Sequence, residues 1–225
     1  MLRISMGAAG WLCLASAALA QSSQPQHWNE SLVSRLEVLA LLQGLNAELL
    51  SHDSATLVLE GWCDRHHIAA PAHIVAERDK AAHKAPTPAQ LKRLGVADGG
   101  QVRYRGVKLI CGNHVLSEAD NWYVLGRLTA DMNQALDTTD IAFGRAVAPL
   151  HFQRHTLSAD LLWSPLPEGW ETAPTIATGG SGPLQIPDHV LQHHAILTRA
   201  DGVPFSEVVE TYSGSVLDFA PPIPR

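Results

Sequence analysis

Residues 190–212 read V-L-Q-H-H-A-I-L-T-R-A-D-G-V-P-F-S-E-V-V-E-T-Y, and this stretch decides the fold. Two β-rich runs, 190–199 and 203–212, flank Asp201-Gly202, and an Asp-Gly pair between such runs is a strong signal for a β-hairpin. If the pair forms a two-residue loop, Ala200 faces Val203. Counting back from there predicts that Glu210 lies opposite His193.

The same kind of signal recurs upstream, where 101–111 and 115–124 flank a Gly-Asn-His turn. Shorter extended runs are predicted at 55–63, 73–77 and 151–163. Helices are predicted at 29–42 behind Asn29, as a short turn at 45–50 beyond Gly44, at 88–94 behind Thr87, and at 130–136 behind Thr129. Because the strands follow one another through hairpins, we expect an α+β fold: a mainly antiparallel sheet with helices packed on it.

The first twenty residues have the pattern of an export signal. Arg3 precedes an apolar run at 4–20, and Ala18-Leu19-Ala20 offers small residues for cleavage before Gln21. The alternative is a membrane-tethering anchor. We therefore expect a signal peptide at 1–20, a single domain at 21–225, and a periplasmic or secreted protein. No other stretch approaches the ~20 apolar residues of a membrane span, so none is expected after signal removal.

The net charge of −6 and the absence of a Lys/Arg run disfavour a nucleic-acid partner. No winged helix precedes the domain, which argues against a DNA-binding regulator. The twelve histidines have no ligand spacing such as H-E-x-x-H, so we interpret them as loop and surface residues rather than as metal ligands. Cys63 and Cys111 either pair in an oxidising compartment or stay as buried thiols.

Glu210 lies inside the apolar run V-V-E-T-Y, where an ionised carboxylate is costly without a partner. Such a residue belongs either to a structural ion pair or to a group that handles a proton. The sequence pattern alone leaves both interpretations open.

Four motifs together resemble bacterial chorismate pyruvate-lyase, in the same order and at similar separations. They are L-L-S-H-D-S-A-T at 49–56, V-K-L-I-C-G at 107–112, T-D-I-A-F-G-R at 139–145 and A-D-G-V-P-F-S-E-V-V-E-T at 200–211. The resemblance implies an antiparallel α+β fold. It also implies an enzyme that splits chorismate into 4-hydroxybenzoate and pyruvate for ubiquinone biosynthesis, with no cofactor. The same fold serves as the effector-binding domain of some transcription regulators.

The resemblance places the family's catalytic glutamate at Glu210. A product-contacting leucine falls on Phe143, and a methionine of the pocket falls on Ala55. His52 is expected to face the ligand at the pocket rim.

The family's anchoring arginine falls on Gly106. We expect Arg105 to replace it as the carboxylate anchor, provided that the strand has a bulge at Gly106, because a bulge re-aims the neighbouring side chain. Arg103 shares the strand parity of Arg105 and is the reserve candidate.

Three hypotheses follow. The first is a chorismate lyase-like enzyme, favoured by Glu210 and the two arginines. The second is an exported, non-catalytic binding domain for a small aromatic acid, favoured by the signal peptide because chorismate is made in the cytoplasm. The third is an unrelated α+β domain with a structural or adaptor role. In the first two the partner is a small aromatic acid, and we expect a monomer.

Overall fold

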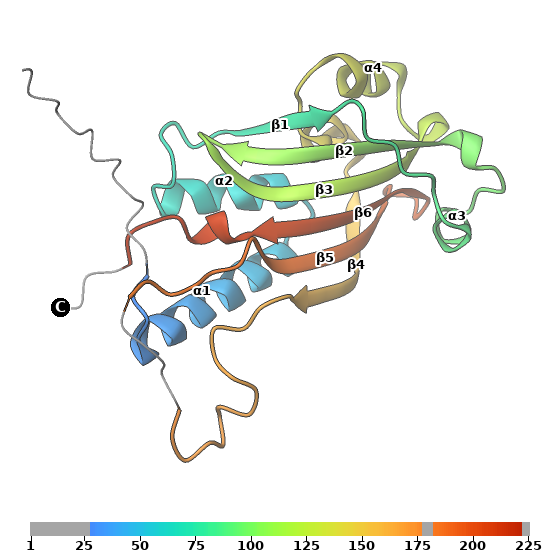
Figure 1. The fold of residues 1–225 in the computed structure, drawn as a ribbon. Helices are drawn as coiled ribbons and strands as arrows, with labels where there is room; N and C mark the ends of the chain where they lie inside the picture. The colour runs from blue at the N-terminus through green and yellow to red at the C-terminus, as the bar shows by residue number, and fades with distance from the viewer. Residues whose placement is uncertain (1–27, 177–181, 222–225) are drawn as a thin grey trace, which may run out of the picture.

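The computed structural model describes residues 28–176 and 182–221. One six-stranded sheet forms its centre, in the order β1-β2-β3-β6-β5-β4, and every neighbouring pair is antiparallel (Figure 1). The strands are β1 (Ile74–Asp79), β2 (Val102–Cys111), β3 (His114–Val124), β4 (Gln153–Leu161), β5 (His189–Thr198) and β6 (Pro204–Ser213). The expected α+β class with a mainly antiparallel sheet is confirmed.

Helices cover the sheet unequally. The helices are α1 (Leu32–Ser51), α2 (Ala55–Arg65), α3 (Pro88–Leu94), α4 (Ala130–Thr138) and α5 (Phe143–Ala146), and the 3₁₀ turns are η1 (Gly99–Gln101), η2 (Leu125–Arg127), η3 (Ala148–Leu150) and η4 (Gly214–Leu217). Helices α1 and α2 lie on one side of the sheet, as Figure 1 shows, and share a hydrophobic core with it. Helix α3 contacts β6, where Arg93 pairs with Glu207.

The strand predicted at 55–63 is wrong, because this stretch forms α2. Its buried residues include Ala55, Val58, Leu59, Trp62 and Cys63, which recur at the three- and four-residue spacing of one helix face. The Ser54 side chain caps the helix by accepting a hydrogen bond from the Leu57 N–H. A short apolar run of this length is compatible with a strand or a helix, and here burial follows the helical period.

Helix α1 is also longer than predicted. Its cap is Ser31 rather than Asn29, and it continues through Gly44 to Ser51 without a break. A glycine inside a helix costs about 1 kcal/mol relative to alanine. The buried residues Leu42, Leu45 and Leu49 outweigh that cost by packing into the core on both sides of Gly44.

The hairpin between β5 and β6 has the predicted pairing but a different turn. Arg199 and Val203 close a three-residue loop, since the Arg199 N–H donates to the Val203 carbonyl over 2.9 Å. A register shift between Leu197 and Thr198 then offsets the extra loop residue. His193 therefore pairs with Glu210, as the sequence predicted.

The expected bulge at Gly106 is absent from β2. Strand β2 pairs with β1 without a break from Gly106 to Cys111, and its register shift against β3 falls between Leu109 and Ile110. Arg105 needs no bulge. It already alternates in phase with Val107 and Leu109, which face the α1–α2 side of the sheet.

Cys63 and Cys111 form a disulfide that joins α2 to β2, which decides between the two states that the sequence left open. None of the described helices is long and apolar enough to cross a membrane. The predicted signal peptide at 1–20 lies outside the described residues.

Candidate functional site

A cavity of about 40 Å³ lies on the helix-covered side of the sheet, below the α1–α2 junction and α5. Its walls are largely apolar, with Val107 and Val208 from the sheet and Phe143 and Phe152 from the connection between β3 and β4. A larger hollow of about 790 Å³ between Trp28 and Leu217 has no buried ionised side chain among its lining residues. The smaller cavity, which has three such side chains, is therefore the candidate site.

Arg105 supplies the first charge. Its side chain reaches the cavity from β2 with only 2% of the residue exposed, and its Nη2 donates to the Ile141 carbonyl over 2.9 Å. The other two nitrogens, Nε and Nη1, are buried and have no hydrogen-bond partner among the described residues. Burial lowers the pKa of Arg105, and the nearby Arg78 lowers it further. In the part of the chain that the structure describes, no carboxylate forms an ion pair with this cation.

Arg154 and Glu210 supply the other two charges as an ion pair. Arg154 Nη2 lies 2.5 Å from Glu210 Oε2, and the two side chains are 4% and 9% exposed. Tyr212 donates to the same carboxylate oxygen over 3.1 Å. The sequence left Glu210 as either an ion-pair partner or a proton-handling group, and the structure shows the ion pair.

A polar network continues beneath this pair. His193 is fully buried, and its Nε2 lies 2.8 Å from Asn46 Oδ1 on α1. Burial, and the neighbouring Arg154, lower the pKa of His193 to about 4. His193 is therefore neutral at pH 7 and adds no charge to the site.

The start of α2 forms the roof of the cavity. Ala55 and Thr56 are the first residues of this eleven-residue helix, and both line the cavity. A helix N-terminus carries a partial positive charge and free backbone N–H groups. Gly144 lets α5 approach this helix start, because a Cβ there would lie 2.9 Å from Ser54 Oγ.

The structure separates the remaining predicted residues. Glu210, Arg105, Phe143 and Ala55 all line the cavity, although the bulge offered for Arg105 is not the reason. His52 does not line it: it is exposed at the end of α1, where its Nδ1 lies 2.8 Å from the Glu48 carbonyl.

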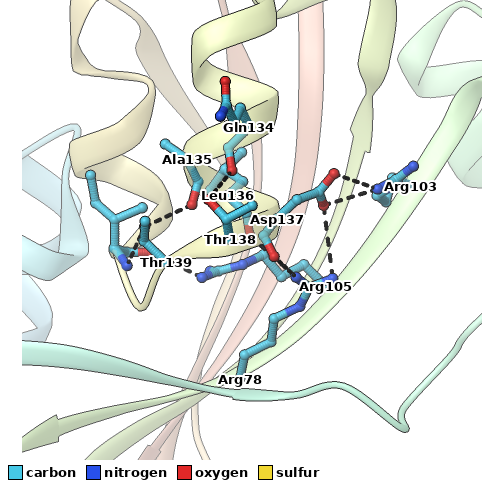
Figure 2. Close-up of polar contacts among 10 residues, drawn as sticks. Arg78, Arg103, Arg105, Gln134, Ala135, Leu136, Asp137, Thr138 and Thr139 are labelled. Atoms are coloured by element: carbon cyan, nitrogen blue, oxygen red, sulfur yellow. Dashed lines mark hydrogen bonds and ion pairs between the residues drawn. The ribbon is translucent and has the colours of Figure 1, made fainter.

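Arg103 is also outside the cavity. It binds both oxygens of Asp137 on α4, over 2.9 and 2.8 Å. Figure 2 shows how the arginines converge on the end of α4, where Arg78 donates to the Leu136 and Asp137 carbonyls. Arg103 is therefore a partner of α4 rather than a reserve anchor.

Sequence reasoning missed Arg154. Its position in the predicted extended run at 151–163 could have indicated it. Phe152, two residues earlier, is apolar and faces inward, and side chains two residues apart on a strand point to the same face. Among the described residues no group of three or more His, Cys, Asp or Glu side chains is placed to hold a metal ion.

No protein-family model matches the chain. The chain is 50% identical over 202 residues to the uncharacterized protein y4mC of Sinorhizobium fredii, covering 89% of this chain and 85% of that protein. It therefore belongs to the same family as y4mC.

Similarity to solved structures is more remote. The effector domain of PhnF from Mycobacterium smegmatis is 15% identical with a TM-score of 0.45, covering 72% of this chain and 89% of that one. A possible transcriptional regulator, YydK from Bacillus subtilis, is 12% identical with a TM-score of 0.37, covering 68% and 62%. The chain thus spans about three fifths of the YydK chain. At these values the likeness concerns the fold at most.

These findings overturn the expected function. YydK and two similar solved structures of the GntR family, from Enterococcus faecalis and Bacillus cereus, are described as transcriptional regulators. The cavity of about 40 Å³ is also far smaller than the ~150 Å³ that accommodates benzene in an engineered protein core, so it does not enclose an aromatic ring. Chorismate lyase activity and its place in ubiquinone biosynthesis are therefore wrong, and the alternative of an exported aromatic-acid-binding domain is not supported. The comparisons support neither the signal peptide nor the exclusion of a nucleic-acid partner.

Proposed function

We propose that the chain binds the anionic group of a small molecule in this cavity and acts through occupancy of the site rather than through chemical conversion. The observation that carries the proposal is Arg105, a buried guanidinium with two unpartnered nitrogens beside the cavity. Glu210, the buried carboxylate that could move a proton, is already held by Arg154 and Tyr212.

The energetics of Arg105 favour an anionic ligand. Arginine stays protonated in proteins, so burial costs it hydration without removing its charge. One carbonyl contact, to Ile141, leaves most of that cost uncompensated. A carboxylate or phosphate oxygen could accept a charge-assisted hydrogen bond from Nη1 or from Nε, the two nitrogens without a partner.

The N-terminus of α2 adds to the same preference. Its first residues line the same cavity as Arg105, and anions are stabilised at such helix ends. The helix end and the unpartnered guanidinium are independent features, and both favour negative charge at one place.

Cavity size limits the ligand. One water needs roughly 10–15 Å³ of such volume, so about 40 Å³ holds the equivalent of a few waters. That space suits the head group of a small anion. Asp53 at the cavity rim is exposed, so the remainder of a longer ligand can leave towards solvent on that side.

The test compares two arginines of the same strand and the same parity. Glycolate is titrated into the wild type, Arg105→Met and Arg103→Met, with binding followed by amide NMR shifts and calorimetry. We expect glycolate to bind the wild type and Arg103→Met, and Arg105→Met to lose binding at least about tenfold, because one charged hydrogen-bonding group is worth ~1.5–3 kcal/mol.

Thermal unfolding separates this role from a purely structural one. Arg105→Met should be as stable as the wild type without ligand, or more stable, because replacing an uncompensated buried charge by an apolar side chain is often stabilising. Equal glycolate binding by wild type and Arg105→Met, or no binding by the wild type, would refute the proposal.

A further inference from the structure

The geometry points to Glu210 as the residue that sets the charge of the ligand, so that the site accepts a monoanion and rejects a dianion. This inference rests on the proposed function and concerns the ligand class of the same cavity. It assigns Glu210 a role in selectivity that is separate from any chemical step.

The first step is a charge count. Three buried ionised side chains line the cavity: Arg105 and Arg154 are positive and Glu210 is negative, which leaves one net positive charge. Asp53 also lies on the rim, but it is exposed and water screens its charge. Its Oδ1 is also occupied by the Arg154 backbone N–H, over 2.8 Å.

The second step is how the charges are distributed. Arg154 is committed to Glu210 through a 2.5 Å contact, whereas Arg105 has no carboxylate partner among the described residues. A single anionic group at Arg105 therefore completes the neutralisation of the site. A second anionic group in so small a cavity would lie close to the Glu210 carboxylate, and like charges in a desolvated site repel strongly.

The other titratable neighbours of Glu210 do not change this count at pH 7. Tyr212 donates its hydroxyl hydrogen to Glu210, and burial raises the pKa of Tyr212, so it stays neutral. His193, opposite Glu210 on β5, is neutral because burial lowers its pKa to about 4. Glu210 thus neutralises one arginine and excludes a second anionic group, a repulsive element of the kind that specific sites use.

Glycolate and oxalate provide a matched pair of probes, because they have the same number of carbons and oxalate carries a carboxylate in place of the hydroxymethyl group. We expect the wild type to bind glycolate at least about tenfold more tightly than oxalate, and Glu210→Gln to reverse this order because Arg154 becomes free. The double variant Arg154→Gln/Glu210→Gln restores one net positive charge and should restore the preference for glycolate.

Glu207→Gln is the control. Glu207 is also a buried carboxylate on β6 paired with an arginine, Arg93, but it does not line the cavity. The Glu207→Gln variant should have the same ratio of glycolate affinity to oxalate affinity as the wild type. Calorimetry at constant ionic strength measures both affinities for the wild type and for the three variants.

Three outcomes decide the inference. Oxalate binding to the wild type as tightly as glycolate overturns the selectivity role and leaves the proposed function intact. An unchanged preference for glycolate in Glu210→Gln also overturns the selectivity role and leaves the proposed function intact. If neither probe binds the wild type, the proposed function fails and this inference fails with it. The wild-type ratio keeps the test decisive even if Glu210→Gln does not fold.

Discussion

Arg103 and Arg105 show how position alone separates two identical side chains. Both lie on β2 with the same parity, two residues apart. Arg103 is near the strand end, where Asp137 of α4 is within reach, and its side chain is 41% exposed. Arg105 lies two residues further along the strand, where its side chain is buried and donates to the Ile141 carbonyl. Burial, rather than residue type, makes Arg105 the candidate ligand contact.

His193 should make stability depend on pH. Its folded-state pKa of about 4 lies below the ordinary value of 6.5, so the unfolded chain binds the proton more readily between these values. Stability should therefore fall as pH drops from 6.5 to about 4, by about 3 kcal/mol on account of this residue. Urea unfolding of wild type and His193→Gln across this range measures the effect.

Several charged groups surround His193 in the folded state: Arg154 and Glu210 in the cavity, and Asp160 nearby on β4. The variant keeps these groups, so the difference between the two pH profiles isolates His193. Identical slopes for the two proteins would show that His193 is not buried in the neutral form.

At the scale of elements, α2 connects the cavity to the sheet. Its first residues form the cavity roof, its middle packs in the core, and Cys63 binds it covalently to β2. Arg105 lies on that same strand. The two features that we propose attract an anion thus lie on elements joined by one cross-link.

Removing that cross-link should destabilise the fold. The disulfide closes a loop with a sequence separation of 48 residues, for which chain entropy predicts a loss of about 4 kcal/mol. We expect Cys63→Ala/Cys111→Ala to unfold at correspondingly lower urea concentration, with glycolate affinity reduced because α2 can shift from β2. Unchanged stability in the variant, or under reducing conditions, would contradict the pairing.

At the scale of the whole molecule, two hairpins meet in the middle of one sheet. Strands β2 and β3 form one hairpin, β5 and β6 form the other, and the β3–β6 pairing joins them. The cavity spans this junction, with Arg105 from the first hairpin and Glu210 from the second. The site therefore exists only when both hairpins are docked.

Export of the protein remains a prediction. The Arg3 and Ala18-Leu19-Ala20 pattern predicts cleavage after Ala20, and a buried disulfide is typical of oxidising compartments. N-terminal sequencing of the protein purified from its host should give a chain that begins at Gln21. A chain that retains residues 1–20 would contradict the prediction.

The sequence by itself determined both hairpins and the antiparallel sheet, because turn residues and alternation act over short distances. The pairing of His193 with Glu210 was predicted from a two-residue loop, whereas in the structure a three-residue loop and a register shift together give the same pairing. The sequence did not determine that 55–63 is helical, since packing on the sheet decides that. Nor did it give the Arg154–Glu210 pair or the isolation of Arg105, which depend on strands far apart in the chain. Buried charges are neutralised by the groups that the fold places beside them, so only the tertiary structure decided which charges of the candidate site are paired.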